Sequence, residues 1–165
     1  MLESVISHAD VKVISNHSFG MVVENPETRQ KSFLASRPIK KGELLSRFGS
    51  GGESKTPTYL TVQIGIERHI KLNPEFLQYI NHSCDPNVFF DTTSFELRAL
   101  KDINTNEELT FFYPSTEWHM DQPFSCYCGS SLCLGNIQGA KFIPANIIKR
   151  YALTDFIAGE LKKNK

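Results

Sequence analysis

The chain has 165 residues, of which 40% are hydrophobic, and its 18 Lys and Arg residues are balanced by 18 Asp and Glu residues. This length is typical of one domain with a substantial core, and zero net charge argues against a protein built mainly to coat nucleic acid. The N-terminal stretch MLESVISHAD lacks a basic segment followed by an apolar one, so no signal peptide is predicted. Because no apolar run approaches the length of a membrane span, we expect a soluble, intracellular protein.

Short β-strands separated by turns are predicted over most of residues 10–113. The expected strands alternate polar and apolar residues or are rich in β-branched and aromatic ones. In chain order they cover Val11 and Val13, then residues 21–24, 32–35, 43–48, 58–66, 95–100 and 108–112. Residues 76–80 are expected to form a single helical turn. GSGGESK at 49–55 is expected to be a flexible loop, because it lacks the spacing of a phosphate-binding loop.

Two stretches within this region are similar to each other. ASRPIKKGELL (35–45) and ALKDINTNEEL (99–109) share the spacing Ala-x-x-x-Ile-x-x-Gly/Asn-Glu-x-Leu. Gly42 and Asn106 occupy the same place, and both residue types tolerate positive φ. We predict two similar strand–turn–strand units, with coincidence in a short window as the alternative.

The last segment has a different pattern. In NIIKRYALTDFIAGELKKNK (146–165) the apolar residues approximate a helical stripe. Pro144 lies just before this segment, and the closing lysines suit the C-terminal end of a helix. A C-terminal α-helix that packs on the domain is therefore predicted, with a helix that binds a partner as the alternative.

The four cysteines indicate a metal site. Cys126, Cys128 and Cys133 lie within eight residues of sequence, and Cys84 is the only other cysteine. Disulfides are the less expected use in a chain without a secretory signal. Zn²⁺ prefers four sulfur or nitrogen ligands in a tetrahedron, so we predict zinc, with buried reduced cysteines as the alternative. The candidates for the fourth ligand are Cys84, His82 and His119.

Three motifs, in this order, resemble the signatures of one family. NHSCDPN (81–87) resembles the first signature of SET-domain lysine methyltransferases, and EELTFFY (107–113) resembles their second signature, usually written ELTxDY. FSCYCGSSLCLGNIQG (124–139) resembles their cysteine-containing post-SET segment. The resemblance implies a mainly β fold: the SET-domain, β-clip-like arrangement of small curved sheets with a pseudoknot, plus a C-terminal α-helix. It places a SET domain at 1–123, a post-SET zinc-binding segment at 124–140 and a helical extension at 141–165.

The same resemblance implies an enzyme, a protein-lysine N-methyltransferase that uses S-adenosylmethionine and carries Zn²⁺. Its partner would be a protein or peptide lysine, with histone tails as the family's commonest substrates, and neither direct nucleic-acid binding nor membrane association is expected. Tyr113 matches the catalytic tyrosine. The matching zinc ligands are Cys84, Cys126, Cys128 and Cys133. The residues expected to contact the cofactor are Gly20, Gln78, Asn81, His82, Tyr113 and Leu134.

Two phenylalanines match positions beside the lysine channel of the family. In that family a tyrosine at such a position restricts the product to fewer methyl groups. Phe90 and Phe111 have no hydroxyl, so the resemblance predicts a product that goes beyond monomethyl-lysine to di- or trimethyl-lysine. The alternative is that both rings fill the core.

Three positions depart from the family pattern. Only Gly20 is clear where a G-x-G is usual, Gln78 replaces an Arg, and Phe112 replaces the Asp before the catalytic tyrosine. The incomplete G-x-G and Gln78 favour one alternative function, a catalytically weak or inactive SET-fold binding module. A second alternative is a methyltransferase for a small-molecule amine. Glu117 and Asp121 are candidates for the substrate entrance or for ordinary solvated acids.

Overall fold

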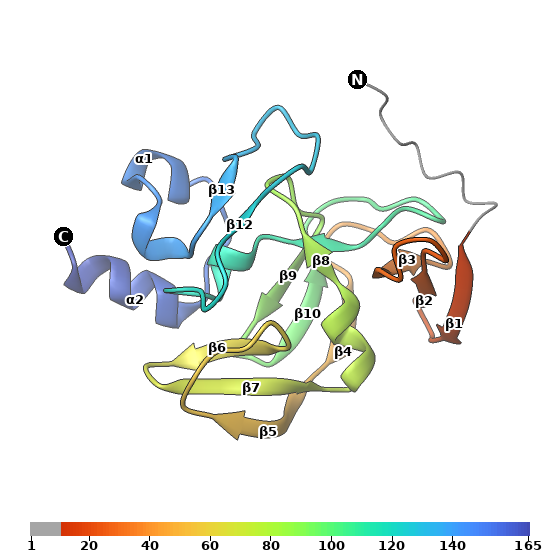
Figure 1. Cartoon of the computed structure of the whole chain (residues 1–165), viewed down its shortest axis with the longest axis horizontal. Coiled ribbons are helices and arrows are strands. Elements are labelled where there is room, and N and C mark those ends of the chain that lie inside the picture. Colours follow the sequence, from red (N-terminus) through yellow and green to blue (C-terminus); the bar gives the residue numbers. More distant parts are fainter. Residues whose placement is uncertain (1–10) are drawn as a thin grey trace.

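The computed structural model describes residues 11–165; residues 1–10, for which no signal peptide is predicted, lie outside the described residues. Over the described residues the strands form five small sheets (Figure 1). The helices are short, so the predicted mainly β fold is confirmed. None of the helices within residues 11–165 is long and apolar enough to cross a membrane.

The N-terminal sheet is an antiparallel meander. Its strands are β1 (Lys12–Asn16), β2 (Gly20–Glu24) and β3 (Lys31–Ala35). Gly20 pairs with Ala35, and a Cβ at Gly20 would overlap the ring of Phe33. This glycine is therefore required by the packing of β2 on β3.

Two further three-stranded sheets follow. The first has the order β4 (Leu44–Arg47), β10 (Glu96–Ala99), β9 (Val88–Asp91), and the second has the order β5 (Gly49–Ser54), β7 (Arg68–Asn73), β6 (Thr61–Gly65). The prediction of a loop at 49–55 is wrong, because β5 pairs along β7. Its glycines and serines have little strand preference, and the pairing with β7 supplies the order that its own sequence lacks. Strand β7 was not predicted.

The two similar stretches form the predicted pair of strand–turn–strand units, and they pair with each other. Ile39 and Ile103 exchange both backbone hydrogen bonds, each 2.9 Å long. Gly42 and Asn106 have φ of 85° and 67°. Each donates its amide hydrogen to the first alanine of the other unit, at 2.8 and 2.7 Å. The prediction is confirmed, and the units are related by a local twofold pseudosymmetry.

Short elements bring the remaining motifs together. The predicted helical turn is the 3₁₀-helix η2 (Glu75–Tyr79). Strand β8 (Asn81–His82) pairs in parallel with β11 (Thr110–Phe111), so the two signature motifs lie side by side. Two more 3₁₀-helices follow, η3 (Tyr113–Ser115) and η4 (Ala140–Phe142), together with the antiparallel pair β12 (Phe124–Ser125) and β13 (Asn136–Ile137).

The C-terminal segment contains two helices, α1 (Ala145–Ile148) and α2 (Asp155–Lys163), so the prediction of one continuous helix is wrong. The helix is interrupted at Tyr151, whose ring stacks on Phe112 with centroids 3.7 Å apart and whose hydroxyl donates to the Cys84 carbonyl at 2.8 Å. Thr154 then caps α2. The predicted packing on the domain is confirmed, since Ile148 and Ile157 are buried. Both helices lie on the side away from β1–β3 (Figure 1).

We expect Tyr151→Ala to lower the free energy of unfolding by roughly 2–4 kcal/mol, because it removes a stacked ring from a packed site. Tyr151→Phe keeps the ring and loses one hydrogen bond, which should cost about 1 kcal/mol. Urea denaturation of both variants measures this. Tyr127→Phe, at a position that is 92% exposed, is the matched control. Equal stability of Tyr151→Ala and the wild type would contradict the assigned anchoring role.

Candidate active site

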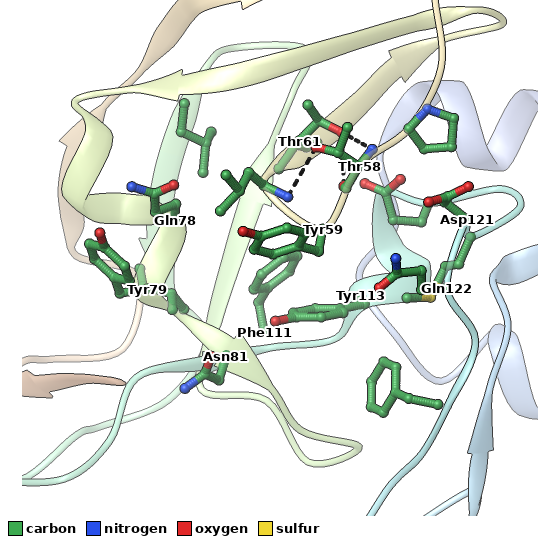
Figure 2. A pocket seen from close by; sticks show the side chains of 18 of the residues that line it. Thr58, Tyr59, Thr61, Gln78, Tyr79, Asn81, Phe111, Tyr113, Asp121 and Gln122 are labelled. Atoms are coloured by element: carbon green, nitrogen blue, oxygen red, sulfur yellow. Dashed lines mark hydrogen bonds between the residues drawn. The ribbon is translucent and has the colours of Figure 1, made fainter. Parts of the chain in front are cut away.

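A cavity of about 630 Å³ lies where several distant segments meet. Its walls come from Arg29 and Lys31 near the start of β3, the 57–62 segment, η2 with β8, the second signature, and Glu117 together with residues 120–124. Figure 2 shows the rings of Tyr59, Phe111 and Tyr113 near its middle, with Gln78 on one side and Asp121 on the other. The arrangement places aromatic groups between two polar ends.

The first signature is polar because its side chains join separate parts of the chain. Asn81 Nδ2 donates to the Lys31 carbonyl at 2.9 Å and to the Glu108 carboxylate at 3.2 Å. Asn87 uses both ends of its amide: its oxygen accepts from the Thr110 amide and its nitrogen donates to the Glu108 carbonyl, each at 2.8 Å. Together these bonds fix the second signature against the first.

His82 connects the second signature with the cysteines. Its Nδ1 accepts a hydrogen bond from the Tyr113 amide at 3.2 Å, so the ring hydrogen lies on Nε2, 3.4 Å from Cys84 Sγ. Burial lowers the pKa of His82 to about 4. A neutral imidazole therefore bridges the backbone of Tyr113 and the sulfur of Cys84.

Tyr113 and Phe111 line the cavity together, with ring centroids 4.7 Å apart. Burial, together with the negative charges of Glu108 and Glu117, raises the pKa of Tyr113 to about 12. The phenol is therefore neutral near pH 7. Phe90 lies behind Phe111, edge-on at 4.7 Å, and is fully buried in the core.

The four cysteines converge although Cys84 is far from the others in sequence. Their sulfur atoms all lie within 4.8 Å of one another, and Cys84 Sγ is 3.9 Å from Cys126 Sγ. Zinc–sulfur bonds of about 2.3 Å in a tetrahedron place the sulfurs about 3.8 Å apart, so this geometry fits the ion. Without a cation, burial raises the pKa of Cys84 and of Cys126. His119 is exposed beside Phe142 and lies outside this cluster.

Comparison with known proteins gives the family. The SET domain family model matches residues 47–114. Methyltransferase flvH of Aspergillus flavus is 41% identical over 141 residues, which cover 82% of this chain and 78% of that protein. The chain belongs to the SET-domain methyltransferase family. The predicted family is therefore confirmed.

Other SET-domain relatives are much longer than this chain. A histone-lysine N-methyltransferase of Emericella nidulans, H3 lysine-4 specific, is 28% identical over 135 residues, which cover 78% of this chain but only 10% of that protein. The crystal structure of KRYPTONITE in complex with mCHG DNA and SAH has a TM-score of 0.51 at 23% identity, covering 64% of this chain and 26% of that one. This likeness agrees with the predicted SET fold.

The structure brings some predicted residues of the SET domain to the cavity and leaves others away from it. Gln78, Asn81, Phe111 and Tyr113 line it. Three predicted cofactor contacts are not among the lining residues. Gly20 lies where β2 packs on β3, and His82 lies behind Tyr113. The Leu134 amide donates a hydrogen bond to Cys84 Sγ at 3.4 Å.

Four charged residues of the cavity were missed or left open by sequence reasoning. Arg29 and Lys31 both line the cavity; the available signal was their position directly before the predicted strand at 32–35. Glu117, left open as an entrance residue or a solvated acid, is only 8% exposed and also lines it. Asp121 borders the same cavity but is exposed. The sequence around Glu117 gave no sign of its burial.

Proposed function

We propose that this SET-domain chain transfers a methyl group from S-adenosylmethionine to the side-chain amine of a lysine in a protein, with histones among the candidate substrates. The observation that carries the proposal is the single cavity that joins Gln78 and Asn81 to Tyr113 and Phe111. The SAH in the KRYPTONITE structure is what remains of S-adenosylmethionine after it has given up its methyl group, and it supports this cofactor.

The cofactor would bind at the polar end formed by Asn81, Gln78 and the start of β3. Gln78 cannot pair ionically with the cofactor carboxylate, but Lys31 and Arg29 provide positive charge on the same cavity. Arg29 already pairs with Glu24 at 3.1 Å. We therefore assign Lys31 as the residue that pairs with the cofactor carboxylate. His82 and Leu134 would act indirectly. His82 accepts from the Tyr113 amide, and the Leu134 amide donates to Cys84 Sγ.

The acceptor amine must be neutral to attack, yet a free lysine has a pKa of about 10.4. An apolar surrounding disfavours its charged form, and a nearby positive sulfonium does the same. Phe111 supplies an apolar wall. The neutral Tyr113 phenol would orient the amine rather than act as a strong base, and alignment of the two reactants is the main catalytic effect expected of it.

We assign zinc to Cys84, Cys126, Cys128 and Cys133, because four converging thiolates are a preferred ligand set for this ion. The ion would tie the first signature to residues 124–139.

No nucleic-acid partner is proposed, because the chain has no net charge. KRYPTONITE was crystallised with DNA, so titration with labelled duplex DNA checks this point, and binding at physiological salt would contradict it.

A second candidate is the methylation of a small-molecule amine. It is favoured by the match to methyltransferase flvH, because this chain covers 78% of a relative whose name specifies no protein substrate. One experiment tests both candidates: purified protein is incubated with labelled S-adenosylmethionine and either a lysine-peptide and lysate panel or a panel of free amines. Mass spectrometry identifies the labelled product. Failure to bind SAH in calorimetry would instead favour a binding module without catalysis.

We expect the product to go beyond monomethyl-lysine, because Phe111 borders the cavity without a hydroxyl. Phe111→Tyr should shift the product mixture towards the monomethyl state without abolishing turnover. A time course resolved by mass measures this. Phe142→Tyr, at an exposed ring outside the cavity, is the control. A wild-type product that stays monomethylated at high enzyme and cofactor concentration would defeat the idea.

A further inference from the structure

Glu117 is a buried carboxylate in the wall of the same cavity as Tyr113. Among residues 11–165 it takes part in no salt bridge. Burying an ionised carboxylate without a cationic partner is costly. Such groups concentrate at functional sites, where a ligand supplies the missing partner.

The fold holds this carboxylate in one place. Glu117 Oε1 accepts hydrogen bonds from the Gln63 amide at 2.9 Å and from the Thr116 hydroxyl at 3.1 Å. The Gln63 side chain in turn accepts from the Trp118 amide at 2.9 Å. These bonds join β6 to the segment after η3. All of the carboxylate's hydrogen bonds within residues 11–165 fall on Oε1, so Oε2 remains available to a ligand.

We propose that Glu117 binds the ammonium group of the acceptor substrate and takes its proton before methyl transfer. The inference rests on the proposed methylation of an amine. The ammonium gives one proton to the Glu117 carboxylate, leaving a neutral amine and a carboxylic acid. The nitrogen lone pair then forms the bond to the methyl carbon while the carbon–sulfur bond breaks, and its electrons stay on sulfur. The acid returns its proton to solvent.

The surroundings of Glu117 suit a group that must gain and lose a proton near neutral pH. Burial raises the pKa of Glu117 to about 7, against the opposing effect of the hydrogen bonds from Gln63 and Thr116. Other titratable groups border the same cavity or lie directly opposite Gln63 on β7. They are Arg29, Lys31, Tyr59, Tyr79, Tyr113, Asp121 and, across from Gln63, His69.

The direction of the pH effect follows from this pKa. Below pH 7 the free enzyme carries the acid form, which cannot pair with an ammonium, and above pH 7 it carries the carboxylate. The wild-type kcat/KM should therefore rise as the pH increases through about 7. In Glu117→Gln no group remains in this position to take the proton, so kcat/KM should instead keep rising towards the pKa of the free amine, about 10.4.

Glu117→Gln separates this role from a structural one. The amide oxygen can still accept from Gln63 and Thr116, so the bridge to β6 is retained while the charge is lost. With a peptide library carrying one central lysine, and with n-butylamine as a minimal acceptor, we expect KM to rise about tenfold or more. SAH affinity and thermal unfolding should stay unchanged. Glu67→Gln changes an exposed acid in the turn between β6 and β7; it is the matched control and should behave as the wild type.

A binding measurement tests the inference independently of turnover. The side-chain carboxyl ¹³C signal of Glu117 is followed by NMR in the SAH-bound wild type. Adding n-butylammonium chloride should shift this signal and lower its titration midpoint, whereas tetramethylammonium, which has no N–H group, should not. An unshifted signal would overturn the inference. An unchanged KM and pH profile in Glu117→Gln, beside an active wild type, would do the same. Failure of the wild type to methylate any acceptor, with the NMR shift present, would contradict only the proposed function.

Discussion

Tyr113→Phe is expected to lower kcat for methyl transfer about 100-fold, because loss of the hydroxyl leaves the amine without its orienting partner. SAH affinity should be nearly unaffected, since the ring and its contact with Phe111 remain in place. The neutral phenol, with its raised pKa, is assigned to alignment. Single-turnover kinetics with labelled cofactor and calorimetry with SAH separate the two effects.

The control for this substitution is Tyr127→Phe, which removes an equivalent hydroxyl from a fully solvated ring in the cysteine segment. It should leave both kcat and SAH affinity at the wild-type level. Wild-type turnover in Tyr113→Phe would remove this residue from the mechanism. A parallel loss of SAH affinity would move its role from alignment to cofactor binding.

The wild-type protein is expected to carry one zinc per chain. Cys126→Ser should lower this metal content and make residues 124–139 less ordered. Apparent zinc-binding free energies at thiolate sites are about 10–16 kcal/mol and are coupled to folding, so loss of one thiolate should affect the whole segment. Cofactor binding should weaken as well, because Cys84 Sγ accepts from both His82 and the Leu134 amide. Metal analysis, native mass spectrometry and hydrogen exchange over 124–139 measure these effects.

Ser125→Ala is the matched control, because it changes an exposed side chain next to Cys126. It should retain the metal and the exchange protection. The zinc assignment would be abandoned if the wild-type protein were well folded and free of metal, with four thiols open to titration.

Sequence reasoning identified the family because its motifs are local. The strand at 95–100, whose burial alternates, and the apolar strand at 21–24 were also predictable from their own residues. Strand β5 was not, because its order comes from pairing with β7 and not from the preferences of glycine and serine. The break in the C-terminal helix was missed for a similar reason: Tyr151 is held by Phe112 and Cys84, contacts that the helical pattern does not contain.

The candidate site likewise contains residues that local motifs predict and residues that only long-range contacts bring into place. Tyr113 and Asn81 were found because they lie within signature motifs, and both line the cavity. Glu117 lies in a mixed segment whose residues do not indicate its burial, and the structure packs it against β6 through the Gln63 amide. Lys31 reaches the cavity because Asn81 binds its carbonyl, a contact between residues 50 positions apart in sequence.

The pairing between residues 35–45 and 99–109 has a consequence for how the chain folds. Ile39 and Ile103 satisfy each other's amide groups, and Gly42 and Asn106 each donate to the opposite unit. The first unit therefore remains without its backbone partners until residues 99–109 have left the ribosome. Contacts of such long sequence separation slow folding, because a large loop must close before they form. Completion of this pairing is thus a late, non-local step, and an N-terminal fragment ending before residue 99 should not acquire the native β3–β4 turn.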